Sequence, residues 1–160
     1  VGKGSTFSMA LPIGKKPRVA DITHTDMLIG DSILIDKIVM LVDDDEVVLD
    51  SISRLFLSWQ CQVLTASSYD EAMDLIIIEE IIPELLVIDY RLPKHKTGVD
   101  LTVQICARCR LSIPAIILTG DTGEESLNHI NRSSLDFLHK PTDSTKLKKK
   151  IKKLLAKEKK

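Results

Sequence analysis

The chain has 160 residues, of which 44% are apolar and 28% charged, enough for one ordinary globular domain with a buried core. Three scattered cysteines argue against a disulfide framework and indicate a reducing, cytoplasmic compartment, and no apolar run approaches the roughly 18 residues of a membrane span. The net charge of −1 is unevenly spread. Residues 146–160 hold nine of the 22 basic side chains and one acid, so the body is acidic and the C-terminal end is basic.

The first 36 residues are predicted to stand apart from the main domain. Polar and apolar residues alternate over residues 6–11, which is the pattern of a strand, and Pro12 ends it. One strand is not stable alone, so its partners would lie elsewhere. Residues 14–36 mix glycine, proline, lysine, aspartate and threonine with scattered aliphatic residues, which is typical of a linker. A chain beginning near Asp36 is therefore expected to fold as well as the full one.

From residue 37 onward, short apolar runs alternate five times with segments of helical periodicity. The runs predict strands at residues 38–42, 61–66, 85–88, 115–118 and 135–138. The helices that follow them are predicted to carry Val48 to Trp59, Ala72 to Ile77, Leu101 to Cys109, residues 124–131, and Leu147 to Leu155. Ser67 or Ser68 is expected to cap the second helix, and residues 94–98 are expected to form a polar loop. The alternation predicts an α/β protein with a doubly wound, five-stranded parallel sheet and helices on both faces.

Asp89 directly follows the apolar run from Leu85 to Ile88. An unbroken apolar run bounded by turn residues indicates a fully buried parallel strand, and chemistry in open parallel sheets lies at the carboxyl ends of strands. Taken alone, Asp89 is better explained as a turn residue that accepts hydrogen bonds from nearby amides. The ends of the other strands reverse that preference.

Polar residues stand at the ends of four predicted strands: Asp43, Asp44, Asp89, Thr119 and Lys140. The ends of parallel strands share one edge of the sheet, so these side chains are expected to converge. Three carboxylates repel one another, and a hard cation such as Mg²⁺ together with a fixed lysine would offset them. Such a site suits a phosphoryl group, with Asp89 as the nucleophile and an aspartyl phosphate as the product.

These residues resemble the receiver domains of two-component signalling. The resemblance covers residues 37–157 and rests on Asp43-Asp44, Asp89 followed by Leu92-Pro93 and Gly98, Thr119-Gly120, and Lys140-Pro141. It implies a flavodoxin-like fold with strand order 2-1-3-4-5. It also implies a phosphoacceptor that takes a phosphoryl group from a phosphohistidine and then switches conformation.

The resemblance implies a role for individual residues as well. Asp44, Asp89 and the backbone carbonyl of Arg91 would bind Mg²⁺ directly, and Asp43 would act through water.

The remaining roles concern the phosphate and the switch. Lys140 would pair with the phosphate, and its bond to Pro141 would be cis. Thr119 would contribute a hydroxyl to the phosphoryl group and act in the switch. Phe137, three residues before Lys140, matches the family's switch aromatic.

The first residues resemble a different family. Residues 2–7 and the strand that follows, up to Pro12, look like the closing glycine motif and last strand of a histidine kinase ATP-binding domain. The expected organisation is a kinase remnant at residues 1–13, a linker at 14–36, a receiver at 37–157 and a basic tail at 158–160. The parent chain would be a hybrid sensor histidine kinase, a phosphotransferase, whereas this piece would promote only its own phosphorylation and dephosphorylation.

The expected partners follow from that organisation. They are a histidine kinase phosphodonor domain, a downstream histidine phosphotransfer protein, and a weakly bound second copy of the domain. We expect no nucleic-acid binding and no membrane contact by this piece, and whether the parent is anchored in a membrane is left open.

The same residues allow other interpretations. A degenerate receiver that acts only through protein contacts is disfavoured by the intact acid pair and Asp89. A dehalogenase-type phosphatase needs an acid two residues after the nucleophile, where Arg91 stands. The lysine-rich end is better explained as the solvated face of a helix than as a nucleic-acid site, and the Cys106–Cys109 spacing as core thiols. Finally, Arg91 and Asp121 are expected to pair across the entrance of the site.

Overall fold

The computed structural model describes residues 33–157, and the structural statements below concern these residues. Five strands form one sheet in the order β2-β1-β3-β6-β7. They are β1 (Ile38–Val42), β2 (Gln62–Ala66), β3 (Leu85–Asp89), β6 (Ala115–Thr119) and β7 (Asp136–His139). All four neighbouring pairs are parallel. Because β6 and β7 are the fourth and fifth strands of the sheet, this confirms the predicted order 2-1-3-4-5.

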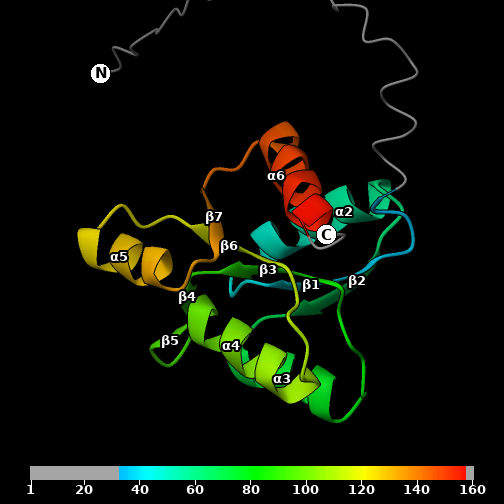
Figure 1. Ribbon diagram of the computed structural model, residues 1–160, viewed down its shortest axis with the longest axis horizontal. Helices are drawn as coiled ribbons and strands as arrows, with labels where there is room; N and C mark the ends of the chain where they lie inside the picture. The colour runs from blue at the N-terminus through cyan, green and yellow to red at the C-terminus, as the bar shows by residue number, and fades with distance from the viewer. Residues whose placement is uncertain (1–32, 158–160) are drawn as a thin grey trace, which may run out of the picture.

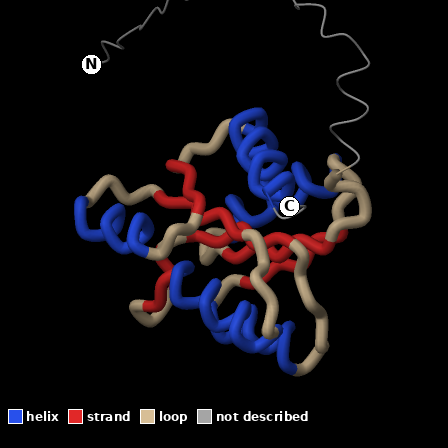
Figure 2. The backbone as a smooth tube through the Cα atoms, in the orientation of Figure 1, coloured by secondary structure: helices blue, strands red, loops and turns tan. Residues whose placement is uncertain are grey.

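Helices cover both faces of the sheet, which confirms the predicted doubly wound architecture (Figure 1). They are α2 (Glu46–Ser58), α3 (Tyr69–Ile77), α4 (Gly98–Cys109), α5 (Glu124–Arg132) and α6 (Ser144–Lys157). Helices α2 and α6 lie on one side of the sheet, and α3 and α4 lie on the other (Figure 2). None of these helices is both long and apolar enough to cross a bilayer.

The two faces of the sheet separate two apolar cores. Alternate residues of each strand point to opposite faces, so Met40 and Val42 join the core under α3 and α4, while Val39 and Leu41 join the core under α2 and α6. Ile130 of α5 belongs to the first of these cores. Strand β3 is buried along its whole length, as expected for the central strand of a doubly wound sheet.

Side-chain caps fix where several helices begin. The carboxylate of Asp45 accepts hydrogen bonds from the amides of Val47 and Val48 at the start of α2. Ser68, not Ser67, caps α3 by accepting from the amide of Glu71, and Glu71 in turn accepts from the amide of Ser67. The sequence allowed either serine, and this reciprocal pairing decides between them.

The predicted polar loop at residues 94–98 differs from what is observed. Strands β4 (Arg91–Leu92) and β5 (Lys96–Thr97) form a short antiparallel hairpin, in which Lys94 and His95 adopt left-handed φ angles of 61° and 58°. The chain then returns to the end of β3, where the Gly98 amide donates to the Tyr90 carbonyl at 2.9 Å. A Cβ on Gly98 would lie 2.3 Å from the Asp89 carbonyl oxygen, so only glycine fits there.

The predicted boundary between linker and domain needs correction. Leu34 is fully buried in the core under α2 and α6, although residues 14–36 were assigned to a linker. The Leu34 carbonyl accepts from Cys61 Sγ at 3.3 Å, and the Asp36 amide donates to the Gln60 carbonyl at 2.9 Å. Residues 33–36 therefore belong to the packed domain. The strand predicted at residues 6–11 lies outside the described residues.

Candidate functional site

Four strand ends meet at one edge of the sheet, as predicted. Asp43 follows β1, Asp89 ends β3, Thr119 ends β6, and Lys140 follows β7. The register aligns Val42 with Ile88 and Asp89 with Leu118, which brings the strand ends side by side. Lys140 thereby contacts Asp43, 97 positions earlier in the chain. Asp43, Asp89 and Thr119 are buried, which is unusual for polar side chains and calls for partners that satisfy them.

Lys140 provides that partner for both carboxylates. Its Nζ lies 2.5 Å from Asp43 Oδ2 and 2.6 Å from Asp89 Oδ1. The backbone holds the lysine in place, because its amide donates to the Thr119 carbonyl at 2.8 Å. The bond between Lys140 and Pro141 is cis. One ammonium group thus joins the ends of three different strands.

Backbone amides satisfy the remaining carboxylate oxygens. Asp43 Oδ1 accepts from the Asp45 amide at 3.1 Å, and Asp89 Oδ2 accepts from the Arg91 amide at 2.8 Å. Asp44 follows Asp43 but is exposed, and Lys140 pairs with Asp43 and Asp89. The adjacent acids Asp43 and Asp44 therefore occupy different environments.

Burial and pairing act against each other on the ionisable groups. Burial raises the pKa of Asp89, and the hydrogen bond and charge of Lys140 only partly oppose this. Burial lowers the pKa of Lys140, but its bonds to Asp43 and Asp89 and their charges more than offset that effect, so the pKa is raised overall. Lys140 stays charged, while the ionised form of Asp89 is held at a free-energy cost.

The two residues expected to act in the switch lie at different depths. Thr119 is buried beside Asp89's strand, and its hydroxyl accepts from the Asp121 amide at 3.0 Å. In the sheet, Thr119 pairs with His139 of β7. Phe137 lies two residues before His139 and packs against the core under α3 and α4. Its ring centroid is 5.5 Å from that of His139. Phe137 is half-buried and is not part of the charged site.

Arg91 and Asp121 face each other across the entrance, as predicted. Arg91 Nη2 lies 2.6 Å from Asp121 Oδ2. Asp121 also accepts from the Ser126 hydroxyl and from the Gly123 amide. These two hydrogen bonds and that of Arg91 hold the pKa of Asp121 well below its usual range. The pair borders a pocket of about 370 Å³ lined by Asp89, Tyr90, Arg91, Thr119, Gly120, Asp121 and Lys140.

Comparison with known proteins assigns the chain to a family. The family model of the response regulator receiver domain matches residues 39–152. The chain belongs to this family. A receiver domain protein described as CheY-like, from Methanospirillum hungatei, is 26% identical and superposes with a TM-score of 0.68 over 78% of this chain and 97% of that one. A receiver domain from Clostridium thermocellum is 23% identical, with a TM-score of 0.66 over 77% of this chain and 97% of its own.

Two curated relatives are much longer than this receiver. One is a two-component response regulator of Arabidopsis thaliana, ARR21, which is 29% identical over 111 residues, 69% of this chain and 18% of the relative. The other is the autoinducer 2 sensor kinase/phosphatase LuxQ of Vibrio parahaemolyticus, 26% identical over 139 residues, 86% of this chain and 16% of the relative. The chain thus spans less than a fifth of the length of either.

The donor set at the receiver's edge fits Mg²⁺, the ion that the resemblance implied. Asp43 and Asp89 are close enough for the charge of Asp43 to raise the pKa of Asp89 further, and this repulsion is the kind that a divalent cation relieves. No three His, Cys, Asp or Glu side chains form a metal cluster among the described residues. Mg²⁺ does not require three, because it keeps several waters and accepts one or two carboxylates.

Sequence reasoning missed some residues around the receiver's site. Ser126, which holds Asp121 in place, gave no signal, because a serine in the first turn of a helix is ordinary. Tyr90 is buried next to Asp89, and its hydroxyl lies 3.2 Å from Nδ1 of His129 on α5. Its position directly after Asp89 was the signal that could have drawn attention to it.

Proposed function

We propose that this receiver domain accepts a phosphoryl group on Asp89 from a phosphohistidine and changes conformation in response. One observation carries the proposal: the Lys140 ammonium group lies within 2.6 Å of carboxylate oxygens from two strands, in a pocket that opens to solvent. A buried carboxylate with a fixed cation beside it is the arrangement that phosphoryl transfer to an aspartate requires.

The chain's own residues would act as follows. A carboxylate oxygen of Asp89 attacks the phosphorus and forms an O–P bond, while the P–N bond breaks and its electron pair stays on the histidine ring. Lys140, which now contacts Asp89 Oδ1, would hold an oxygen of the transferred group. The Thr119 hydroxyl would leave the Asp121 amide to donate to another oxygen. Phe137 would move with it as the second switch residue.

Mg²⁺ would be held by Asp44, Asp89 and the Arg91 carbonyl, with Asp43 contributing through water. When bound, the ion would neutralise phosphoryl oxygens and the repulsion between carboxylates. Two observations support this: Asp44 is exposed to solvent, and Asp89 and Arg91 line the pocket.

We further propose that the parent chain is a hybrid sensor histidine kinase whose receiver lies in the cytoplasm, with a downstream histidine phosphotransfer protein as a second partner. The match to LuxQ supports this, because 86% of the chain cannot fit within residues 33–160 and the match therefore reaches into the first 32 residues. The parent would be the phosphotransferase, and the receiver would promote only its own phosphorylation and dephosphorylation. The sequence encoded before Val1 should contain an ATP-binding domain and a donor histidine; their absence would contradict the assignment.

The phosphorylation proposal is tested with acetyl phosphate and with beryllofluoride, each with and without Mg²⁺. The unmodified 160-residue chain should form an acid-stable, base-labile adduct only when Mg²⁺ is present, and Asp89→Asn should form none. Asp74→Asn, at an exposed position on α3, is the matched control and should react as the unmodified chain does. Modification of Asp89→Asn would show that another residue is the acceptor. Failure of every variant to react would favour a receiver that acts only through protein contacts.

A further inference from the structure

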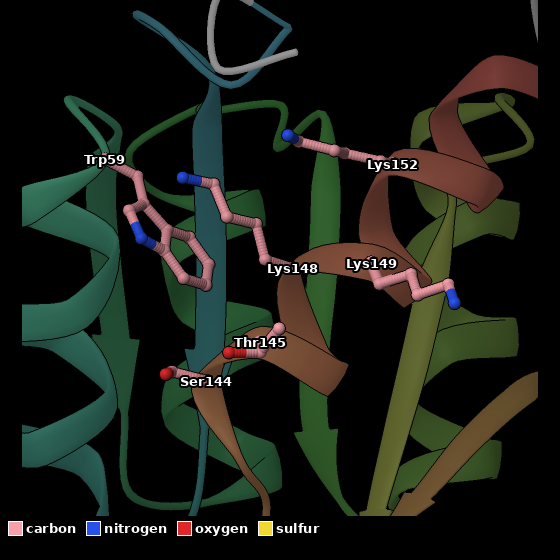
Figure 3. A pocket seen from close by; sticks show the side chains of 6 residues that line it. All are labelled: Trp59, Ser144, Thr145, Lys148, Lys149 and Lys152. Carbon is pink, nitrogen blue, oxygen red and sulfur yellow. The ribbon is translucent and has the colours of Figure 1, made fainter. Parts of the chain in front are cut away.

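A second pocket, which shares no residue with the phosphoacceptor pocket, lies between the end of α2 and the first turns of α6. It has a volume of about 350 Å³ and is lined by Trp59, Ser144, Thr145, Lys148, Lys149 and Lys152. Lys148 Nζ lies 5.1 Å from the centroid of the Trp59 ring. Figure 3 shows Lys148 and Lys152 extending from α6 toward the side on which Trp59 lies. The pocket thus combines an aromatic wall with a cationic rim.

The charge around this pocket is one-sided. Helix α6 carries seven lysines and no acid between Ser144 and Lys157. Among the described residues that line the pocket, none is acidic. Lys150 does not line the pocket, and its Nζ lies 2.5 Å from Asp136 Oδ1 on β7. The electrostatic potential of the pocket therefore favours an anionic occupant.

The described chain begins next to this pocket. The contacts of Leu34 with Cys61 and of Asp36 with Gln60 place residues 33–36 against the segment that follows Trp59. An extended chain advances by up to about 3.6 Å per residue. The residues that precede position 33 therefore start within a short reach of Trp59 and α6.

Those preceding residues have a composition that complements the pocket. Residues 19–32 contain Asp21, Asp26 and Asp31 and no lysine or arginine. Between the last two aspartates stands the apolar run Met27-Leu28-Ile29. A tethered segment has an effective concentration in the millimolar range, so weak contacts are enough to populate a docked state.

We propose that residues 19–32 dock in the pocket between α2 and α6, with their aspartates on the lysine rim and Met27-Leu28-Ile29 against Trp59. Docking would attach the segment that leads into the receiver to helix α6. It would therefore set the position of any upstream domain relative to the receiver. Because the ionic part of this attachment is solvent-exposed, salt weakens it. The proposal concerns a different face from the phosphoacceptor site and does not depend on phosphorylation of Asp89.

Trp59 reports on this docking, because it is the only tryptophan of the chain. Acrylamide quenching of its fluorescence is compared between the full 160-residue chain and a variant with Asp21→Asn, Asp26→Asn and Asp31→Asn. Docking predicts weaker quenching in the unmodified chain, by roughly twofold, and a smaller difference between the two proteins at about 0.5 M salt, where the Debye length falls to a few ångströms and the ionic contacts are screened. The charge-matched control carries Asp50→Asn, Asp74→Asn and Glu79→Gln at exposed positions outside the pocket and should be quenched as the parent is.

Charge reversal on α6 tests the other side of the contact. Lys149→Glu with Lys152→Glu should expose Trp59 as the aspartate variant does, whereas Lys146→Glu with Lys153→Glu, which lie outside the pocket lining, should not. Equal quenching in the parent and all variants at low salt would overturn the proposal. Protection of Trp59 that grows with protein concentration would also overturn it, because the occupant would then be a second copy.

Discussion

Two regions of this receiver domain bring distant segments together by opposite physical means. At the carboxyl edge of the sheet, Lys140 joins Asp43 to Asp89, so three charged groups are taken largely out of water. Under α2 and α6, Leu34 and Phe56 are both fully buried and apolar. Burying charges has a desolvation cost that pairing only partly returns, whereas burying apolar side chains stabilises the fold directly.

The difference shows which region holds the fold together and which carries its chemistry. The raised pKa of Asp89 means that its ionised form is less favourable in the folded domain than in the unfolded chain. The domain retains this carboxylate at a cost in stability, and the apolar core under α2 and α6 offsets that cost. Changes in the apolar region should therefore reduce stability most, and changes at the edge should alter chemistry more than stability.

The largest loss of stability is expected from Leu34→Ala. Removing a fully buried leucine side chain from a packed core typically costs about 2–5 kcal/mol of unfolding free energy. A chain starting at Asp36 should lose at least as much, and one starting at Ile33 should retain this contribution. Urea unfolding measures both. Ile35→Ala, whose side chain is 41% exposed, is the control and should change stability by less than about 0.5 kcal/mol. Equal losses for Leu34→Ala and Ile35→Ala would show that the apolar contact is not needed.

Lys140→Ala should come next in size. It leaves Asp43 and Asp89 buried without their cation, and since Lys140 is 25% exposed we expect a loss of about 2–3 kcal/mol at neutral pH, at the lower end for a broken buried pair. The variant should still fold, but it should respond poorly to beryllofluoride in NMR chemical shifts. Adding Asp89→Asn to Lys140→Ala should restore part of the stability. A normal beryllofluoride response in Lys140→Ala would contradict the role of the lysine.

Asp89→Asn should raise stability slightly at neutral pH, by on the order of 1 kcal/mol, the size of an ordinary substitution. The sign follows from the raised pKa of Asp89: protonation favours the folded state, so the penalty of the carboxylate is present above the folded pKa and disappears as pH falls below the unfolded pKa. Unfolding curves of parent and variant measured from neutral to acidic pH should therefore converge. A variant that is less stable than the parent at neutral pH would contradict this.

Arg91→Ala with Asp121→Ala should change stability least, because Arg91 is 75% exposed. The pKa of Asp121 is lowered, so whatever stability its contacts provide is present at neutral pH and is lost only as pH falls below the ordinary carboxyl range. The chemical effect should be larger: with the entrance open to water, the acyl phosphate should have a shorter lifetime. An unchanged or longer lifetime, measured by the decay of the phosphorylated form, would show that this pair does not restrict water.

Much of the fold could be predicted from the sequence because local patterns agreed with one another. Apolar runs such as residues 85–88 indicated buried strands, and their alternation with helical periodicity indicated a doubly wound architecture. The positions of Asp43, Asp89, Thr119 and Lys140 at strand ends followed from the same pattern. Their convergence at one edge of the sheet therefore follows from the sequence pattern.

Only the tertiary structure decided the features that depend on contacts between distant segments. Leu34 stands among linker-like residues, and its burial depends on Cys61 and the α2/α6 core, which no local pattern reveals. The choice of Asp43 over its neighbour Asp44 as a partner of Lys140 depends on which side of the chain faces β3 and β7 after β1 ends. The hairpin at residues 91–97 has no strong hydrophobic alternation that would predict it from the sequence. Its position depends on the close approach of Gly98 to the Asp89 carbonyl. Sequence periodicity reports how each element is buried, but specific partners are selected only when the packed elements bring them together.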